Sequence, residues 1–224
     1  MPIENTKADG SKFSMISLDI AKAIPPDAWR KIVKTACREF EKLIAPITEL
    51  TWGVGMIIRS KFDQLTDSEK IVVAQTLAIA REKVSASRRE HNPEPNAVIL
   101  SNIINNADAQ ANPNLRNLWS NLLARELTTG SVHPEVADIL AGLTVRDVTR
   151  LISLAQVDGE SLRITWKWKG ILPGPTMEVK YADLILERLG LLELVEANIK
   201  ANIKVTKAGA AFLHYIKPVL PEQK

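Results

Sequence analysis

The sequence predicts a mainly α-helical protein, with a helical bundle followed by a winged-helix-like α+β module. Between residues 27 and 155, apolar residues recur at spacings of three and four, the period of helices that bury one face. Beyond residue 160, β-branched and aromatic residues alternate with polar ones in short stretches, as they do in strands. The expected segments are a flexible N-terminal segment over 1–26, the bundle over 27–142 and the winged-helix-like domain over 143–218.

Composition and charge narrow the class of protein. The 224 residues are 46% hydrophobic and 25% charged, an ordinary globular profile. The net charge of +3 is small for a dedicated nucleic-acid-binding protein, in which a basic stripe is expected. The single cysteine, Cys37, has no internal disulfide partner, which fits a reducing cytosol. We find no signal peptide and no apolar run of spanning length, so we expect a cytoplasmic protein without a membrane span.

The first predicted helix begins near Pro26, a residue suited to a first helical turn, and carries an apolar stripe from Trp29 to Ile44. The following stretch, "LIAPITELTWGVGMII", predicts a helix kinked near Pro46 that packs in a core or at an interface. Thr66 and Glu69 have the spacing of a capping box and predict the start of the next helix.

Residues 95–154 carry the densest helical pattern. Asn112 and Pro113 are suited to a helix start, and Gly130 to the end of the same helix. The next helices are expected to start at Pro134 and at Thr144 with Asp147. Leucine-rich turns with brief connections predict a bundle of short helices. The positions expected to be most strongly buried are Leu115, Leu118, Trp119, Leu122, Leu123 and Leu127.

The C-terminal part alternates strand and helix signals. "SLRITWKWKG" predicts a strand and "EVKYADLILERLG" a helix closed by Gly190. "LLELVEANIKANIKVT" predicts two strands with a turn around 197–202, and "KAGAAFLHYIKP" a terminal helix. This order is that of a winged helix, except that a loop with Pro173 and Pro175 stands where a second helix is expected.

Residues suited to catalysis or to metal binding are dispersed. The three histidines, His91, His133 and His214, have no ligand partner at metal-binding spacing. We therefore expect neither a metal nor a cofactor, and we assign His133 to the turn that starts a helix. Four carboxylates could converge in a bundle, namely Asp108, Glu126, Glu135 and Asp138. We expect them on exposed helix faces, and the alternative is that a pair of them acts as general acid and base.

The best candidates for contact with a partner lie in the C-terminal module. Residues 161–224 hold ten Lys and Arg against six Asp and Glu, a mild basic excess that favours weak electrostatic contact over sequence-specific readout. The helix expected to enter a groove offers a near-neutral mix that includes Asp183, Glu187 and Arg188. We predict contact with a protein partner or with nucleic acid at Trp166, Lys167, Trp168, Lys169, Lys200 and Lys204. For the two tryptophans, a place in the core is the alternative.

One stretch also resembles a known family. In "NPNLRNLWSNLLARELTTGSVHPEVADILAGLTVRDVTRLISL", a Leu-Trp-x-x-Leu-Leu-Ala helix precedes a His-Pro and then a Leu-Thr-x-x-Asp helix start. The motif positions are Leu118, Trp119, Leu122, Leu123, Ala124, His133, Pro134, Leu143, Thr144 and Asp147. This pattern is similar to the Abi-alpha family of bacterial abortive-infection proteins, over roughly residues 40–216. In place of the acidic residues that often precede the helix in that family, this sequence has Asn112, Pro113, Asn114 and Arg116.

The resemblance implies a part in phage defence and brings no catalytic residues with it. We therefore expect a non-enzymatic protein that binds a phage or host component, and self-association is a further hypothesis. The alternative is a DNA-binding transcriptional regulator that uses the C-terminal winged helix.

Overall fold

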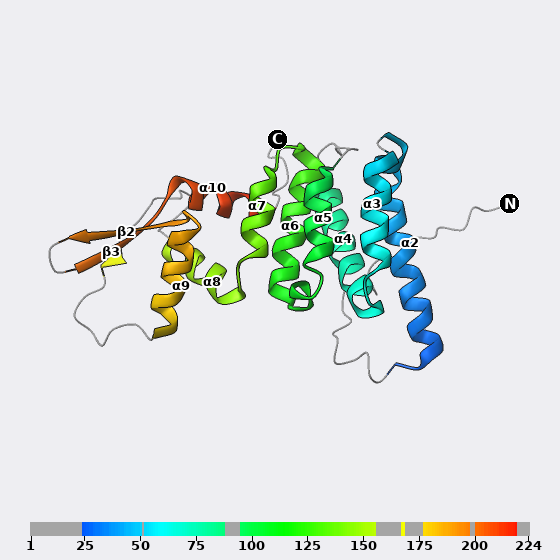
Figure 1. Ribbon diagram of the computed structural model, residues 1–224, viewed down its shortest axis with the longest axis horizontal. Coiled ribbons are helices and arrows are strands. Elements are labelled where there is room, and N and C mark those ends of the chain that lie inside the picture. Colours follow the sequence, from blue (N-terminus) through cyan, green and yellow to red (C-terminus); the bar gives the residue numbers. More distant parts are fainter. Residues whose placement is uncertain are drawn as a thin grey trace. The chain divides into compact units, whose positions relative to one another are not determined.

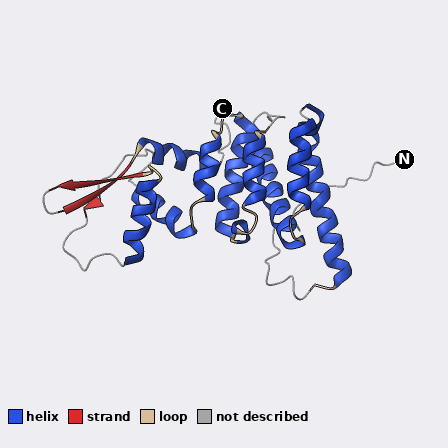
Figure 2. Ribbon diagram, viewed as in Figure 1, coloured by secondary structure: helices blue, strands red, loops and turns tan. Residues whose placement is uncertain are grey.

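The structure is a computed structural model that describes residues 24–50, 52–87, 95–155, 167–168, 177–197 and 200–218. The protein is mainly α-helical, as predicted (Figure 2). In chain order, the elements are α2 (Pro26–Leu50), α3 (Trp52–Asp63), α4 (Asp67–Ser87), α5 (Ala97–Asn105), the 3₁₀ helix η2 (Ala109–Ala111), α6 (Pro113–Thr129), α7 (Pro134–Ala141), α8 (Val145–Ala155), β1 (Lys167–Trp168), α9 (Met177–Arg188), β2 (Leu192–Ala197), β3 (Lys200–Val205) and α10 (Lys207–Ile216).

The described residues divide into two compact units within α7. The first unit contains those up to Ala137, together with Pro218, and the second unit contains those from Asp138 to Lys217. Among the described helices, none is both long and apolar enough to cross a membrane. The predicted segment boundaries at residues 26 and 142 stay predictions.

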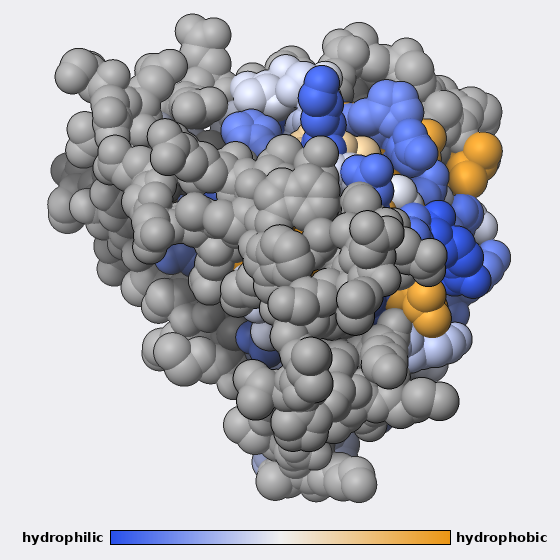
Figure 3. Space-filling model, turned by 90° about the vertical axis from the view of Figure 1, so that its left-hand side faces the viewer, coloured by the Kyte–Doolittle hydropathy of each residue, from blue (hydrophilic) through white to orange (hydrophobic). Residues whose placement is uncertain are grey.

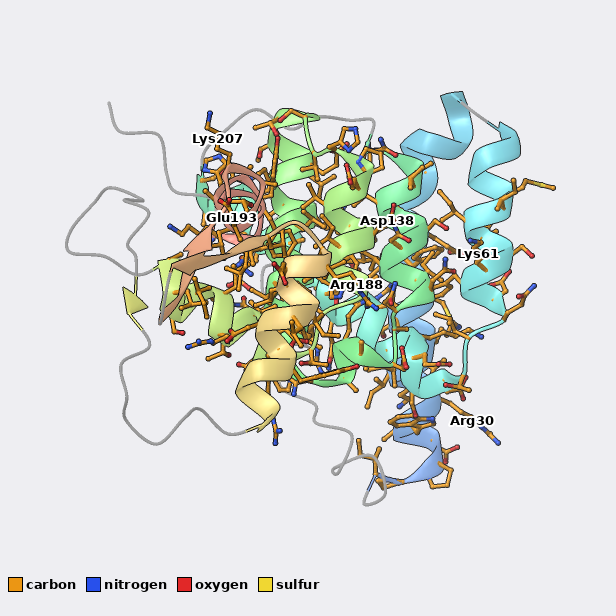
Figure 4. All side chains as sticks on the ribbon, turned by 60° about the vertical axis from the view of Figure 1, so that its left-hand side comes forward. Arg30, Lys61, Asp138, Arg188, Glu193 and Lys207 are labelled. Atoms are coloured by element: carbon orange, nitrogen blue, oxygen red, sulfur yellow. The ribbon has the colours of Figure 1, made fainter. Side chains whose placement is uncertain are left out.

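The first unit is a stack of helices (Figure 1). Helix α2 packs against α3 and α4, α3 against α5, and α4 against α6. The rings of Phe40 and Phe62 are stacked with their centroids 3.8 Å apart. Lys61, labelled in Figure 4, joins α3 to α5 through a 2.7 Å hydrogen bond from its Nζ to Ser101 Oγ. The stack therefore buries apolar side chains from every one of these helices.

The helix boundaries of the first unit follow local chemistry. At the start of α4, the Thr66 amide donates to Glu69 Oε2 at 2.8 Å, which confirms the predicted capping box. Asn112 caps α6 by accepting from the Asn114 amide at 2.9 Å. Gly130 ends α6 at φ 58°, a left-handed conformation that glycine adopts without a steric penalty.

The predicted kink near Pro46 stays a prediction. Helix α2 passes through Pro46 and ends at Leu50, and α3 begins at Trp52. A proline inside a helix removes one backbone donor, and its ring crowds the carbonyl of the residue four positions earlier. Residues 1–23 of the predicted flexible N-terminal segment lie outside the described residues.

The second unit combines α8, α9 and α10 with a three-stranded antiparallel sheet of order β1-β3-β2. In the hairpin, Leu192 pairs with Val205 and Leu194 with Ile203, which confirms the two predicted strands. Helix α9 ends at Arg188, and Gly190 closes it as predicted, with φ 70° and a 2.9 Å bond from the Leu191 amide to the Leu186 carbonyl.

The described elements do not establish the predicted winged helix. A winged helix places two helices between its first and second strands, whereas the residues described here place only α9 between β1 and β2. Most of the predicted strand over 161–170 lies outside the described residues, and only Lys167 and Trp168 form β1. The fold established here is thus a mainly helical one, with a small sheet in its second unit.

Candidate functional site between helices α4 and α6

The first unit buries a set of polar side chains where α4 packs against α6. Burying a polar group costs free energy unless it is hydrogen-bonded, so each of these positions needs a partner. They group into an Arg116 cluster and a Lys83 cluster. The members that are at most 6% exposed are Gln75, Thr76, Gln110, Arg116, Ser120 and Asn121.

The Arg116 cluster holds a buried guanidinium among neutral acceptors. Arg116 Nη1 donates to Gln75 Oε1 at 2.6 Å, its Nε to the Gln110 carbonyl at 2.9 Å and its Nη2 to the Ala111 carbonyl at 3.1 Å. In the described part of the chain, no carboxylate lies within ion-pair distance of Arg116. Burial lowers the pKa of the guanidinium from its usual value. An arginine nevertheless keeps its proton, so the Arg116 guanidinium is a buried positive charge.

Gln110 extends the Arg116 cluster to the end of α5. Its Oε1 accepts from Thr76 Oγ1 at 2.7 Å, and its Nε2 donates to the Asn106 carbonyl at 3.1 Å and to the Ile103 carbonyl. The side-chain amide therefore uses its donor and acceptor sides together, as a buried amide must to avoid a desolvation cost. These bonds tie α4 to the turn between α5 and α6.

The Lys83 cluster joins the second half of α4 to α6. Lys83 Nζ donates to Asn117 Oδ1, Ser120 Oγ and Asn121 Oδ1, each at 2.6 Å. Burial lowers the pKa of Lys83 to about 8, and the nearby Glu82 carboxylate partly offsets this effect. The three N–H donors of the ammonium each have a short contact. The charged lysine therefore cross-links two helices, and it is a weak nucleophile while it holds its proton.

The pKa of Lys83 predicts a pH dependence of stability. The folded-state pKa of about 8 lies below the usual 10.5, so the unfolded chain binds more protons between these values. The free energy of unfolding should therefore rise with pH through this window, by on the order of 1 kcal/mol after allowance for solvent screening of a half-buried group. Urea unfolding of Lys83→Met across pH 7–10.5 should lack this rise.

Lys207→Met is the matched control for that experiment, because it removes a lysine from an exposed position, labelled in Figure 4. This variant should keep the wild-type rise in stability with pH. An unchanged pH dependence in Lys83→Met would show that the lysine loses its proton at the same pH in the folded and unfolded chains.

Glu126 is a buried carboxylate that the sequence interpretation placed wrongly on an exposed face. It is 2% exposed, and it accepts from the Asn96 amide at 2.8 Å and from the Val132 amide at 3.1 Å. Glu126 thus fixes the start of α5 to the segment after α6. The signal was present, because Glu126 continues the spacing of Trp119, Leu122 and Leu123 on one helix face. The other three carboxylates, Asp108, Glu135 and Asp138, are exposed as predicted.

The structure describes two of the three histidines and the single cysteine. His133 Nδ1 accepts from the Glu135 amide at 3.3 Å, which confirms its predicted place in the turn that starts α7. His214 is exposed on α10, and His91 lies outside the described residues. Burial raises the pKa of the half-buried Cys37 thiol. The described residues contain no group of three His, Cys, Asp or Glu side chains placed to hold a metal ion.

Four of the six predicted contact residues lie in the sheet. Lys167 and Trp168 form β1, and Lys200 and Lys204 belong to β3. The backbone register pairs Lys167 with Ile203 and Lys204 with Glu193, so these positions come from two adjacent strands. Trp166 and Lys169 lie outside the described residues. Contact of these six residues with a partner stays a prediction.

Asp183 is also placed differently from the sequence interpretation. It was expected among the groups that α9 offers to a groove, but its side chain is buried. Arg150 on α8 donates to it twice, from Nε at 2.8 Å and from Nη2 at 3.3 Å. This two-pronged contact, together with burial, assigns Asp183 to the α8–α9 interface. The outer face of α9 instead carries Tyr181, Leu184 and Arg188.

Comparison with known proteins adds one finding. A family model described as "Abortive infection alpha" matches residues 68–217. No curated protein and no solved structure matches the chain. The matched range runs from the first turn of α4 to the residue after α10, and it includes the Arg116 and Lys83 clusters.

Proposed function

Because the chain belongs to the abortive infection alpha family, we propose that it acts in abortive-infection defence against phages. The observation that carries this proposal is the family match, which covers most of the chain and elements of both units. In this proposal the protein works in the cytoplasm of a bacterial cell and recognises a phage or host component. Family membership supports the process, while the mechanism has to come from the chain's own residues.

The motif residues that carry the family resemblance have structural roles in this chain. Trp119, Leu122 and Leu123 are at most 1% exposed in the core of the first unit. Asp147 Oδ2 accepts from the Thr144 amide at 2.8 Å and forms the capping box of α8. These motif residues thus specify a scaffold, and in this proposal the partner meets other surfaces.

We further propose that the protein acts through protein contact, without catalysis of its own. Large hydrophobic side chains at exposed positions support this mode, because such residues are typical of contact surfaces when they gather in patches. The exposed ones are Met56, Ile57, Val98, Ile152, Tyr181 and Leu184. On the face drawn in Figure 3, hydrophobic residues form small patches among hydrophilic ones. Met56 with Ile57, and Tyr181 with Leu184, are two pairs on single helices.

A phage challenge tests the proposed role. Phages should form fewer plaques on lawns of cells that express the protein than on lawns of cells with an empty vector. Infected cultures should survive at low phage-to-cell ratios and collapse at high ones, the signature of infected cells that die before releasing phage. A frameshifted copy of the gene controls for plasmid burden. Unchanged plaque counts and culture survival across a broad phage panel would contradict the role.

A further inference from the structure

We propose that the outer stripe of α9, formed by Tyr181, Leu184 and Arg188, binds the same stripe of a second copy in an antiparallel helix pair. This α9 stripe would make the protein a symmetric dimer through its second unit. The inference rests on the surface of α9 alone, so it holds or fails independently of the defence role.

Helix α9 has one buried face and one exposed face. Its inner face carries Asp183 and Leu186, which are 2% and 0% exposed, and packs against α8. On the outer face, Tyr181 is 67% and Leu184 is 53% exposed, and Arg188 is also exposed. Spacings of three and four residues place these three side chains on one stripe of the helix.

The residue types of the α9 stripe are those that bind other proteins. Tyrosine and arginine are enriched among the residues that dominate interface free energies, and an apolar centre with a polar rim is the usual arrangement. A tyrosine and a leucine with more than half of their surface in water gain the hydrophobic free energy of burial when they are covered.

The stripe is complementary to itself. In a two-fold interface, residue i contacts residue j of the other copy, and j contacts i in return. An antiparallel pair centred between Leu184 and Ile185 brings Tyr181 opposite Arg188 of the partner subunit, at both ends of the stripe. A guanidinium over a tyrosine ring is a favourable cation–π contact, and the two leucines meet near the axis. One stripe thus supplies the ring, the cation and the apolar centre that its partner needs.

A nucleic acid is a poorer occupant for this stripe. Contacts to phosphates and base edges come mainly from cationic, amide and hydroxyl side chains. The three exposed residues contribute one cation, Arg188, beside a tyrosine and a leucine. This balance favours a second copy of the chain over a duplex.

The oligomeric state of the full chain tests the proposal. Light scattering after size exclusion, over a concentration series, should show a wild-type dimer that dissociates on dilution. Leu184→Asp should be monomeric with an unchanged circular dichroism spectrum. Ile57→Asp is the matched control, because Ile57 is 59% exposed on α3, and it should remain dimeric. Arg188→Glu should weaken dimerisation roughly tenfold, through loss of two cation–π contacts.

A cross-link makes the test specific for geometry. With Cys37, the only cysteine, replaced by serine, Leu184→Cys should form a disulfide-linked dimer on mild oxidation, because the two copies of residue 184 meet near the axis. Ile57→Cys in the same background should stay unlinked. A monomer at every concentration, without the 184–184 cross-link, would overturn the proposal. Salt-sensitive duplex binding that Arg188→Glu abolishes, in a chain that stays monomeric, would overturn it in favour of nucleic acid.

Discussion

Trp119→Ala is expected to lower the free energy of unfolding by about 3–5 kcal/mol. Trp119 is 1% exposed, and among the described residues it is the largest of the fully buried side chains. Alanine at this position removes the apolar surface that folding buries and leaves a cavity, because the close-packed helices around it relax only partly. The transition that includes the first unit should therefore shift to lower temperature by on the order of 10 °C.

Leu118→Ala provides the neighbouring control for Trp119. Leu118 is half-buried on the same helix, contrary to the strong burial predicted for it, so its truncation should cost less than half as much. Thermal and urea unfolding, followed by far-ultraviolet circular dichroism, compare the two variants with the wild type. A near-wild-type Trp119→Ala would contradict the packing of α6 described here.

The second large effect is expected at Gly209, in the first turn of α10. A Cβ atom built on Gly209 would lie 2.2 Å from the Leu191 carbonyl oxygen, far inside van der Waals contact. That oxygen accepts from the Thr206 amide at 3.1 Å, while Thr206 Oγ1 accepts from the Gly209 amide at 3.0 Å. A shift of the Leu191 carbonyl away from the new methyl group would strain its bond from the Thr206 amide. Gly209→Ala should therefore destabilise the second unit by about 2–4 kcal/mol.

Gly142→Ala is the control substitution, because a Cβ there would meet the Ile139 carbonyl oxygen at an ordinary 3.6 Å. Its free energy of unfolding should stay within about 0.5 kcal/mol of the wild type. Urea titration of both variants measures the difference. Equal stabilities would show that α10 lies farther from Leu191 than the structure places it.

The helix boundaries could be predicted from the sequence because local chemistry decides them. The Thr66–Glu69 and Thr144–Asp147 capping boxes and the glycine ends at Gly130 and Gly190 follow from residues within a few positions of one another. The β2–β3 hairpin followed in the same way from alternation on both sides of a short turn. These features need no knowledge of distant parts of the chain.

The polar clusters depend on contacts between residues far apart in sequence, and so they escaped prediction. Lys83 meets Asn117, Ser120 and Asn121 more than thirty positions away, and Arg116 meets Gln75 across a similar separation. Periodicity shows which face of a helix is turned inward, but it does not identify the partner that makes a polar residue tolerable there. Arg116 was therefore interpreted only as a departure from an acidic pattern.

The predicted contact residues were chosen from residue type, whereas the core was predicted from helical periodicity. Four of them were chosen for a strand-like stretch of tryptophan and lysine over 166–169, and Lys200 and Lys204 for their positive charge. The structure places Lys167 and Trp168 in β1 and the two later lysines in β3. The exposed stripe of α9 gave no comparable signal, because tyrosine and leucine in an amphipathic helix are more often buried than exposed. Only the packing of α9 through Asp183 and Leu186 shows which apolar residues remain outside.

The Lys83 cluster also gives the protein a built-in kinetic reporter. A lysine ammonium that holds three hydrogen bonds has to release them and lose a proton before its nitrogen reacts with an acylating reagent. Its labelling rate therefore follows how often those hydrogen bonds break, and the exposed Lys207 provides a comparison within the same chain. The ratio of the two rates, read by mass spectrometry within one sample, would report whether a bound partner loosens or tightens the first unit.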